Sequence, residues 1–278
     1  MHSFLEFAKS HGVLIDKLNV SGNIARCGTV KNPNSKNGAY VYSGNGGWVQ
    51  AWDGDGNVHV YKRDRQISQS EKSALKKEQT KRIQEQERKH KEAREKAKEI
   101  INSAKYERHA YLAQKGFPDE VGLVIDEILY IPMRDIITYD LVGYQSIKWT
   151  GEGFEKKMLY GMRAKGAGLV LGDRKARKTI LCEGYATGLS IHRAIKNGRL
   201  NASVTVCFSA NNLEYIASKL RGVYIFADND KSGVGEGVAK STGYHYVLSD
   251  IEGEDANDLM VRAGIFAVQK KVLELLSK

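Results

Sequence analysis

Residues 179–187 read Thr-Ile-Leu-Cys-Glu-Gly-Tyr-Ala-Thr, and this stretch decides the fold. Its apolar first half is typical of a buried strand, and the glycine after it marks a sharp turn into a helical pattern over 186–195. The order of strand then helix recurs downstream, with strands at 204–208, 223–227 and 244–248 and helices at 213–220 and 236–241. Apolar strands that alternate with helices predict an α/β fold, in which helices flank both faces of a parallel sheet.

Acidic residues follow three of these strands. Glu183 ends the first strand, Asp228 ends the third with Asp230 two residues later, and Asp255 and Asp258 follow the fourth. Parallel strands bring their carboxyl ends to one edge of the sheet, where active sites form. Several carboxylates at one edge need a cation, and oxygen ligands suit Mg²⁺ or Mn²⁺. A single acid after a strand would instead be expected to cap a helix.

Two of these stretches resemble the motifs of Toprim domains. Glu-Gly-Tyr-Ala-Thr at 183–187 is similar to the first motif, and Asp-Asn-Asp-Lys-Ser-Gly at 228–233 is similar to the Asp-x-Asp-x-x-Gly motif. Toprim domains occur in bacterial-type primases, topoisomerases and some nucleases, and the chain looks most like phage and plasmid primases over residues 107–264. The closer likeness lies in Ser209-Ala-Asn-Asn-Leu, Asp255-Ala-Asn-Asp-Leu, Ile131-Pro-Met-Arg-Asp, Leu141-Val-Gly-Tyr-Gln-Ser-Ile and Lys157-Met-Leu-Tyr-Gly.

The resemblance implies a role for each of the acids. Glu183 would be the catalytic acid or base, and Asp228 and Asp230 would complete the catalytic set. The same three residues would bind magnesium, assisted by Asp255 or Asp258. Bacterial replicative primases carry Asp-Pro-Asp in the late motif; this chain keeps the first acid and has asparagine at the second, so Asp258 would substitute for it.

Positive side chains near the acids would offset charge on nucleotide phosphates. The candidates are Lys157, Arg163 and Lys231, with Lys156 and Lys165 as further ones, and Lys157 is favoured because it lies in the primase-like strand. The resemblance implies a DNA primase-like, magnesium-dependent nucleotidyltransferase that makes short RNA primers from ribonucleoside triphosphates on single-stranded DNA. Two alternatives stay open: a magnesium-dependent Toprim nuclease, and a non-enzymatic DNA-binding replication accessory protein.

Composition narrows the expected cofactors and partners. The three cysteines show no Cys-x-x-Cys spacing, so we expect no zinc site and no disulfide framework. A net charge of +10 favours a polyanionic partner. Residues 168–172 lack the Lys-Ser/Thr ending of an ATP-binding loop, so a primase would need a separate helicase. No apolar run of eighteen residues and no secretory signal occur, so we expect no membrane contact and a cytoplasmic location.

Four segments are predicted along the chain. The first, over 1–66, is a small mixed, β-rich N-terminal domain and a candidate for nucleic-acid binding. The second, over 67–106, is a charged helical linker that starts at a Ser68–Glu71 capping box. A small α+β primase-like subdomain over 107–175 and the Toprim domain over 176–278 follow. The linker would be solvated or would rest on a phosphate backbone. The aromatic residues of the first segment would either stack on bases or form its core, and these are Tyr40, Tyr42, Trp48, Trp52 and Tyr61.

Overall fold

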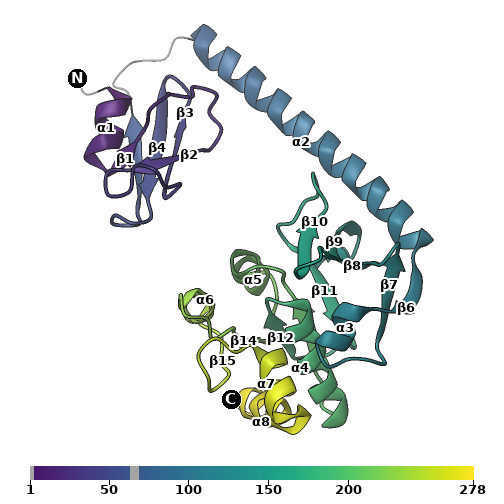
Figure 1. Ribbon diagram of the computed structural model, residues 1–278. Coiled ribbons are helices and arrows are strands. Elements are labelled where there is room, and N and C mark those ends of the chain that lie inside the picture. Colours follow the sequence, from purple (N-terminus) through teal and green to yellow (C-terminus); the bar gives the residue numbers. More distant parts are fainter. Residues whose placement is uncertain (1–2, 63–68) are drawn as a thin grey trace. The chain divides into compact units, whose positions relative to one another are not determined.

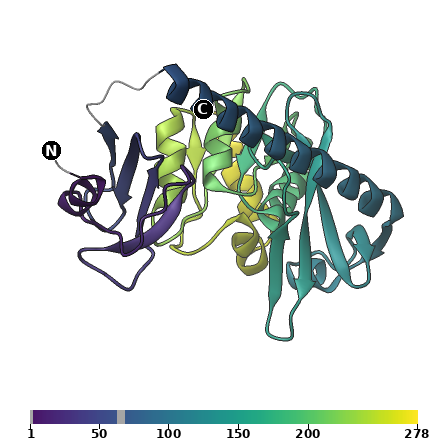
Figure 2. The ribbon, with the colours of Figure 1, turned by 90° about the horizontal axis from the view of Figure 1, so that it is seen from above.

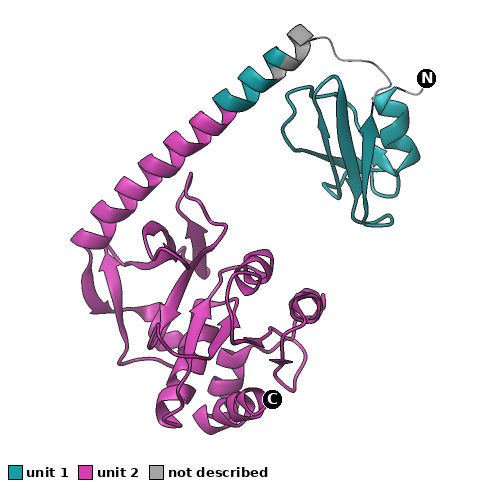
Figure 3. Cartoon of the chain, turned by 180° about the vertical axis from the view of Figure 1, so that it is seen from behind, with its two compact units in different colours: residues 1–81 teal, residues 82–278 magenta. Residues whose placement is uncertain are grey.

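The computed structural model describes residues 3–62 and 69–278. Its contacts divide the chain into two compact units, residues 1–81 and 82–278 (Figure 3). The predicted boundary between 66 and 67 and the predicted N-cap Ser68 lie outside the described residues, as does the side chain of Glu71, so the structure does not test the predicted capping box. In the described part of the chain, none of the helices is long and apolar enough to cross a bilayer.

Unit 1 is a five-stranded antiparallel sheet with one helix packed on it. The strands follow each other in chain order: β1 (Val13–Leu14), β2 (Ala25–Thr29), β3 (Gly38–Tyr42), β4 (Gly46–Ala51) and β5 (Val58–Lys62). Helix α1 (Phe4–Ser10) begins at a capping box, in which the Ser3 N–H donates to Glu6 Oε2 at 2.7 Å. The capping box satisfies amide groups that the first helical turn would otherwise leave unpaired.

The tyrosines of this unit form its core. The ring of Phe4 stacks on Tyr42 with centroids 4.3 Å apart, and it meets Tyr40 at 6.0 Å and Tyr61 at 5.4 Å. The two tryptophans do not belong to this buried cluster. The core role that the sequence left open therefore holds for the three tyrosines, and base stacking by the tryptophans stays a prediction.

Unit 2 is built on one ten-stranded mixed sheet (Figure 1). Its order is β10-β9-β8-β11-β13-β12-β14-β15, with β7 also paired to β8 and β6 paired to β7. The strands are β6 (Lys105–Arg108), β7 (Val121–Ile125), β8 (Ile128–Asp135), β9 (Leu141–Trp149), β10 (Phe154–Met158), β11 (Ala167–Leu171), β12 (Thr179–Cys182), β13 (Ser203–Val206), β14 (Val223–Phe226) and β15 (Tyr246–Val247). Helix α2 (Gln69–Ser103) spans the division between residues 81 and 82. The other helices of unit 2 are α3 (Ala110–Gln114), α4 (Tyr185–Asn197), α5 (Ala210–Ala217), α6 (Val234–Thr242), α7 (Ala256–Ala263) and α8 (Ile265–Leu276).

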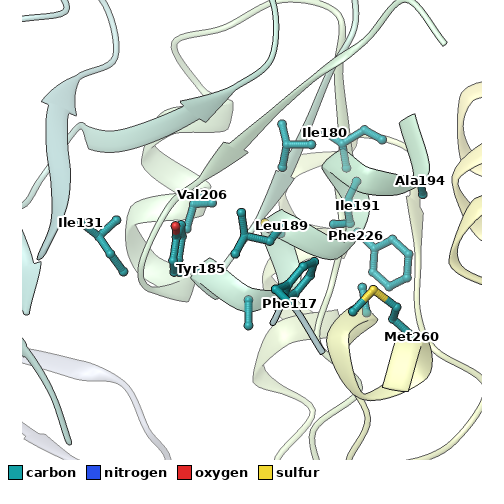
Figure 4. Packing of buried hydrophobic residues seen from close by; sticks show 14 of the residues in the cluster. Phe117, Ile131, Ile180, Tyr185, Leu189, Ile191, Ala194, Val206, Phe226 and Met260 are labelled. Carbon is teal, nitrogen blue, oxygen red and sulfur yellow. The ribbon is translucent and has the colours of Figure 1, made fainter. Parts of the chain in front are cut away.

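The parallel part of this sheet consists of β13, β12, β14 and β15, and helices cover both of its faces. Successive residues of a strand point to opposite faces. Ile180 packs into a core with α4, α7 and α8, whereas Leu181 packs on the other side with α5 and α6. Figure 4 shows the first of these cores, where Phe226 and Met260 lie close to Ile191. The predicted fold class is confirmed, with a sheet that is mixed because antiparallel strands extend it.

Strand β11 joins the antiparallel strands to the parallel strands, and the sequence did not predict it. It pairs antiparallel with β8 on one side and with β13 on the other. The buried Asn212 side chain secures this junction: its Nδ2 donates to the carbonyls of Ala167 and Cys207, each at 2.7 Å, and its Oδ1 accepts from the Gly166 N–H at 2.8 Å. The sheet is thus continuous across the predicted boundary between 175 and 176.

The C-terminal part of α2 packs on the sheet of unit 2 (Figure 2). Ala93 and Ala97 are buried against Tyr144 and Leu159. Residues four apart lie on one face of a helix, so two small side chains let the helix approach the strands closely. This part of the predicted linker therefore belongs to the folded unit, although most of the helix surface is charged and exposed.

Replacing Ala97 by glutamate tests this packing. Ala97 is 0% exposed, so a longer, charged side chain would overpack the contact and bury a carboxylate, at a cost of about 3 kcal/mol. The matched change Lys96→Glu on the exposed face should shift the stability by no more than about 0.5 kcal/mol. Calorimetric unfolding of both variants measures the difference, and equal melting temperatures would contradict the packing.

Candidate active site

Two carboxylates leave the sheet side by side. Strands β12 and β14 are parallel neighbours in which Leu181 lies opposite Ile225. Glu183 directly follows β12, and Asp228 follows β14 after one further residue. Both side chains line one small pocket, together with Gly235 at the start of α6. The structure therefore brings together the two acids that the sequence placed at separate strand ends.

Asp228 is the least compensated acid of the site. Its Oδ1 is buried and has no hydrogen-bond partner among the described residues. The pKa of this carboxyl is raised to about 7, first by burial and then by the negative charges of Asp255, Glu183, Asp230 and Asp258, in that order. An unpaired buried carboxylate oxygen beside other acids is a position that a cation would stabilise.

Glu183 and Asp230 have opposite pKa shifts. Burial, and then the charge of Asp230, raise the pKa of Glu183. The pKa of Asp230 is lowered, because its carboxylate accepts hydrogen bonds from the Ser232 hydroxyl and from the Gly235 N–H, the latter at 3.1 Å. Glu183 therefore holds a proton more readily than an exposed glutamate does, whereas the ionised form of Asp230 is favoured.

The backbone of the second acidic loop closes tightly around these groups. Gly233 adopts φ = 68°, a left-handed conformation that favours glycine, and it starts α6. A Cβ at Gly235 would lie 2.6 Å from the Asp228 carbonyl oxygen and 3.3 Å from Asp230 Oδ2. Glycine at 235 thus leaves a space between the two aspartates that a side chain would fill.

Asp255 and Asp258 cap a helix. The sequence did not predict α7, and its N-terminus is held by a capping box of these two residues. Asp255 Oδ1 accepts from the N–H groups of Asn257 at 2.7 Å and Asp258 at 2.9 Å, while its Oδ2 accepts from the Thr187 hydroxyl at 2.8 Å. Both acids still lie near enough to raise the pKa of Asp228. Both oxygens of Asp255 accept hydrogen bonds, and the metal-binding role of Asp255 and Asp258 stays a prediction.

Lys156 lies beside the acids. Its Nζ lies 5.4 Å from the centroid of the Tyr111 ring. Desolvation and the charge of Lys115 lower the pKa of Lys156, while the carboxylates of Asp255 and Asp228 act in the opposite direction. These couplings place the Lys156 ammonium group within electrostatic reach of the acidic edge.

The three basic residues favoured by the sequence lie in other surroundings. Lys157, next to Lys156 on β10, extends to Glu155 with an Nζ–Oε1 distance of 2.8 Å. Arg163 pairs with the buried carboxylate of Asp135, at the end of β8. Lys231 is exposed within the loop of the second acidic motif. Because neighbouring residues of a strand point to opposite faces, Lys156 and Lys157 have different environments.

A pocket next to the acids contains basic groups that the sequence did not single out. It lies where α3 and β10 meet α7, and it is lined by Tyr111, Gln114, Lys115, Phe154, Lys156, Glu254, Asn257, Asp258, Val261 and Arg262. The Lys115 ammonium lies 4.0 Å from Asp258 Oδ1, and Arg262 Nη2 donates to Glu254 Oε2 at 3.0 Å. Lys115 and Arg262 follow no recognisable motif, so only the folded arrangement identifies them.

The acidic edge suits a magnesium ion that retains waters. Across residues 3–62 and 69–278, no three His, Cys, Asp or Glu side chains already stand at metal-ligating separations. Magnesium commonly binds through one or two carboxylates and completes its shell with water and substrate phosphate. The unpaired Asp228 oxygen, the neighbouring Glu183 and the space at Gly235 fit that mode of binding.

A comparison with protein families agrees with this geometry. The family model described as Toprim domain matches residues 178–265, so a Toprim domain occupies this part of the chain. No curated protein sequence matches the chain. Toprim domains are typical of enzymes that act on DNA, and they imply a magnesium-dependent role in nucleic-acid processing, as in primases, nucleases or topoisomerases.

The raised pKa of Asp228 predicts how stability depends on pH without metal. The folded-state pKa lies above the unfolded value, so the folded protein binds the extra proton and loses stability as pH rises from about 4 to about 7. Asp228→Asn removes this loss and should be more stable than wild type at pH 8 by on the order of 2–3 kcal/mol. Thermal unfolding in EDTA at several pH values measures the difference, and a constant difference across the range would contradict the assignment.

Proposed function

We propose that the chain is a DNA primase-like nucleotidyltransferase that joins ribonucleotides on a single-stranded DNA template. The observation that supports this best is the single sheet shared by the primase-like segment and the Toprim domain through β11. Because of this junction, Lys115 and Lys156 of the first part lie beside the acids of the second. Phosphate-binding cations next to magnesium-binding carboxylates are what transfer of a nucleotide from a triphosphate requires.

The acids divide the chemistry between them. Asp228 and Asp230 would hold magnesium, which when bound offsets negative charge on the substrate phosphates. Glu183, whose raised pKa makes it a stronger base than an exposed glutamate, would take the proton from the attacking 3′-hydroxyl. Lys156 and Lys115 would contact the triphosphate of the incoming nucleotide, and Lys157, Arg163 and Lys231 stay candidates for contacts with the rest of the substrate.

The same proposal covers the partners of the protein. Single-stranded DNA and ribonucleoside triphosphates would be its substrates, and a separate replicative helicase would supply the unwound template. The likeness of residues 107–264 to phage and plasmid primases supports this arrangement.

Removal of single acids tests the chemistry. With magnesium, single-stranded DNA and labelled ribonucleotides, the wild type should make new oligoribonucleotides. Glu183→Gln and Asp228→Asn should each lower the rate by at least about a hundredfold, because each removes a proton acceptor or a metal ligand. Asp250→Asn is the matched control, since this exposed acid pairs with Lys271 at the surface.

The products of this assay decide between activities. Shortened DNA in place of new oligoribonucleotides would identify a magnesium-dependent nuclease. Full activity in both acid variants would contradict a catalytic role for these residues and would favour an accessory DNA-binding function.

A comparison of Lys156 and Lys157 tests the phosphate contact. Lys156→Ala should raise the KM for ribonucleoside triphosphates by about tenfold, because a charge-assisted hydrogen bond to phosphate is lost. Lys157→Ala removes the same charge from the neighbouring position and should change KM by less than about twofold, since that side chain pairs with Glu155. Equal effects of the two changes would show that only the overall charge matters.

A further inference from the structure

The sheet of unit 1 has two different faces. Directly paired residues of antiparallel strands share a face. The row Ala25, Tyr40, Val49 and His59 belongs to the face that α1 covers. The alternate positions belong to the opposite face, and among the described residues none of their side chains joins the buried cluster under α1.

This opposite face, which we call the open face, carries apolar and aromatic side chains. One cross-strand row consists of Val41, Trp48 and Val60. The neighbouring row runs from Arg26 through Ala39 and Gln50 to Val58, and Trp52 continues the alternation beyond β4. Val60 is 62% exposed and Trp52 is 47% exposed. Apolar groups left in water on one face of a small sheet indicate a surface that binds a ligand.

The side chain and the backbone of Trp52 each contact a neighbouring residue, and its indole ring presents a flat aromatic surface. The guanidinium carbon of Arg26 lies 4.1 Å from the centroid of the Trp52 ring. The backbone N–H of Trp52 donates to the Asn37 carbonyl at 3.0 Å, which fixes the backbone at this position. A planar cation stacked on an exposed indole is an arrangement on which nucleic-acid bases stack, with the arginine near the phosphates.

The charges near the open face favour a polyanion. Strands β2 to β5 contain no Asp or Glu, whereas Arg26 and Lys62 both point to the open face. Two acids, Asp53 and Asp55, lie in the turn after Trp52. Asp53 Oδ2 accepts from the Thr29 hydroxyl at 2.7 Å, and Asp55 accepts from the ring of His59 at 2.7 Å. Both carboxylates are thus engaged by neighbouring side chains of the unit.

We propose that the open face of unit 1 binds single-stranded DNA. Bases stack on Trp52 and Trp48, and phosphates contact Arg26 and Lys62. This inference rests on the proposed function only in taking DNA as the substrate; binding at the open face requires neither magnesium nor the catalytic acids. The site would hold a stretch of template, and its stacking contacts accept any base because every base has an aromatic face.

Fluorescence anisotropy of the full chain tests the site. Binding of a labelled oligo(dT) of about fifteen nucleotides is measured in EDTA, so that metal-dependent contacts at the acidic edge do not contribute. Trp52→Ala should weaken binding about tenfold, whereas Trp52→Phe, which keeps a stacking ring, should retain most of it. Arg26→Gln should weaken binding more than Lys9→Gln, which removes the same charge from α1 on the other side of the sheet.

Several outcomes would overturn the proposal. Wild-type affinity for oligo(dT) in Trp52→Ala would contradict stacking at this site. Equal losses of affinity in Arg26→Gln and Lys9→Gln would contradict the phosphate contact, because they would show that only the overall charge matters. An equal loss of duplex binding in Trp52→Ala would also contradict stacking, because bases stacked within a duplex cannot stack on a side chain. A change from dimer to monomer in Trp52→Ala, with DNA binding kept, would instead identify an interface between copies of the chain.

Two controls show whether a loss of DNA binding is specific to the open face. Unchanged circular dichroism and melting temperature of each variant show that unit 1 stays folded. Asp228→Asn should bind oligo(dT) in EDTA as the wild type does, because it alters the acidic edge alone. Loss of binding in that variant would contradict a separate site, whereas failure to make oligoribonucleotides would affect the proposed activity and leave the binding result intact.

Discussion

The parallel pairing of β12 with β14 is the constraint on which the rest of unit 2 depends. It places Glu183 and Asp228 at one edge of the sheet, partly buried and close to further acids. Burial and repulsion both oppose ionisation there, so the folded chain holds Asp228 at a free-energy cost that a divalent ion would offset. The hydrophobic contacts on both faces of the sheet supply the stability needed to hold such a site together.

The junction at β11 gives this acidic edge its basic neighbours. Asn212 satisfies backbone groups on both sides of the junction, so the antiparallel strands and the parallel strands form one rigid sheet. Lys156 lies on β10 of this sheet, and Lys115 follows α3, where its carbonyl accepts from the Asn257 side chain of α7 at 2.8 Å; both lysines lie near the acids. A Toprim domain can therefore take cations from a segment that lies before it in the chain.

The two aspartates of the late motif stabilise the start of a helix. Asp255 and Asp258 start α7, and Thr187 on α4 donates to Asp255 and so ties that helix to the first acidic motif. Their charges still act on Asp228 across the edge. A carboxylate can stabilise a helix end and shape the electrostatics of a neighbouring site at the same time, because the field of a charge extends beyond its hydrogen bonds.

The sequence by itself determined the parallel strands and the acids at their ends, because apolar strands that alternate with helices admit few arrangements and the acids directly follow them. It also determined the long charged helix, although not the burial of Ala93 and Ala97. Only the tertiary structure decided that Lys156 faces the acids rather than Lys157, that Asp255 caps a helix, and that the tyrosines of unit 1 pack in its core cluster while Trp52 is exposed. The physical reason is that strand register and the cover of each sheet face depend on contacts between residues far apart in the chain, whereas alternation and turn signals are local.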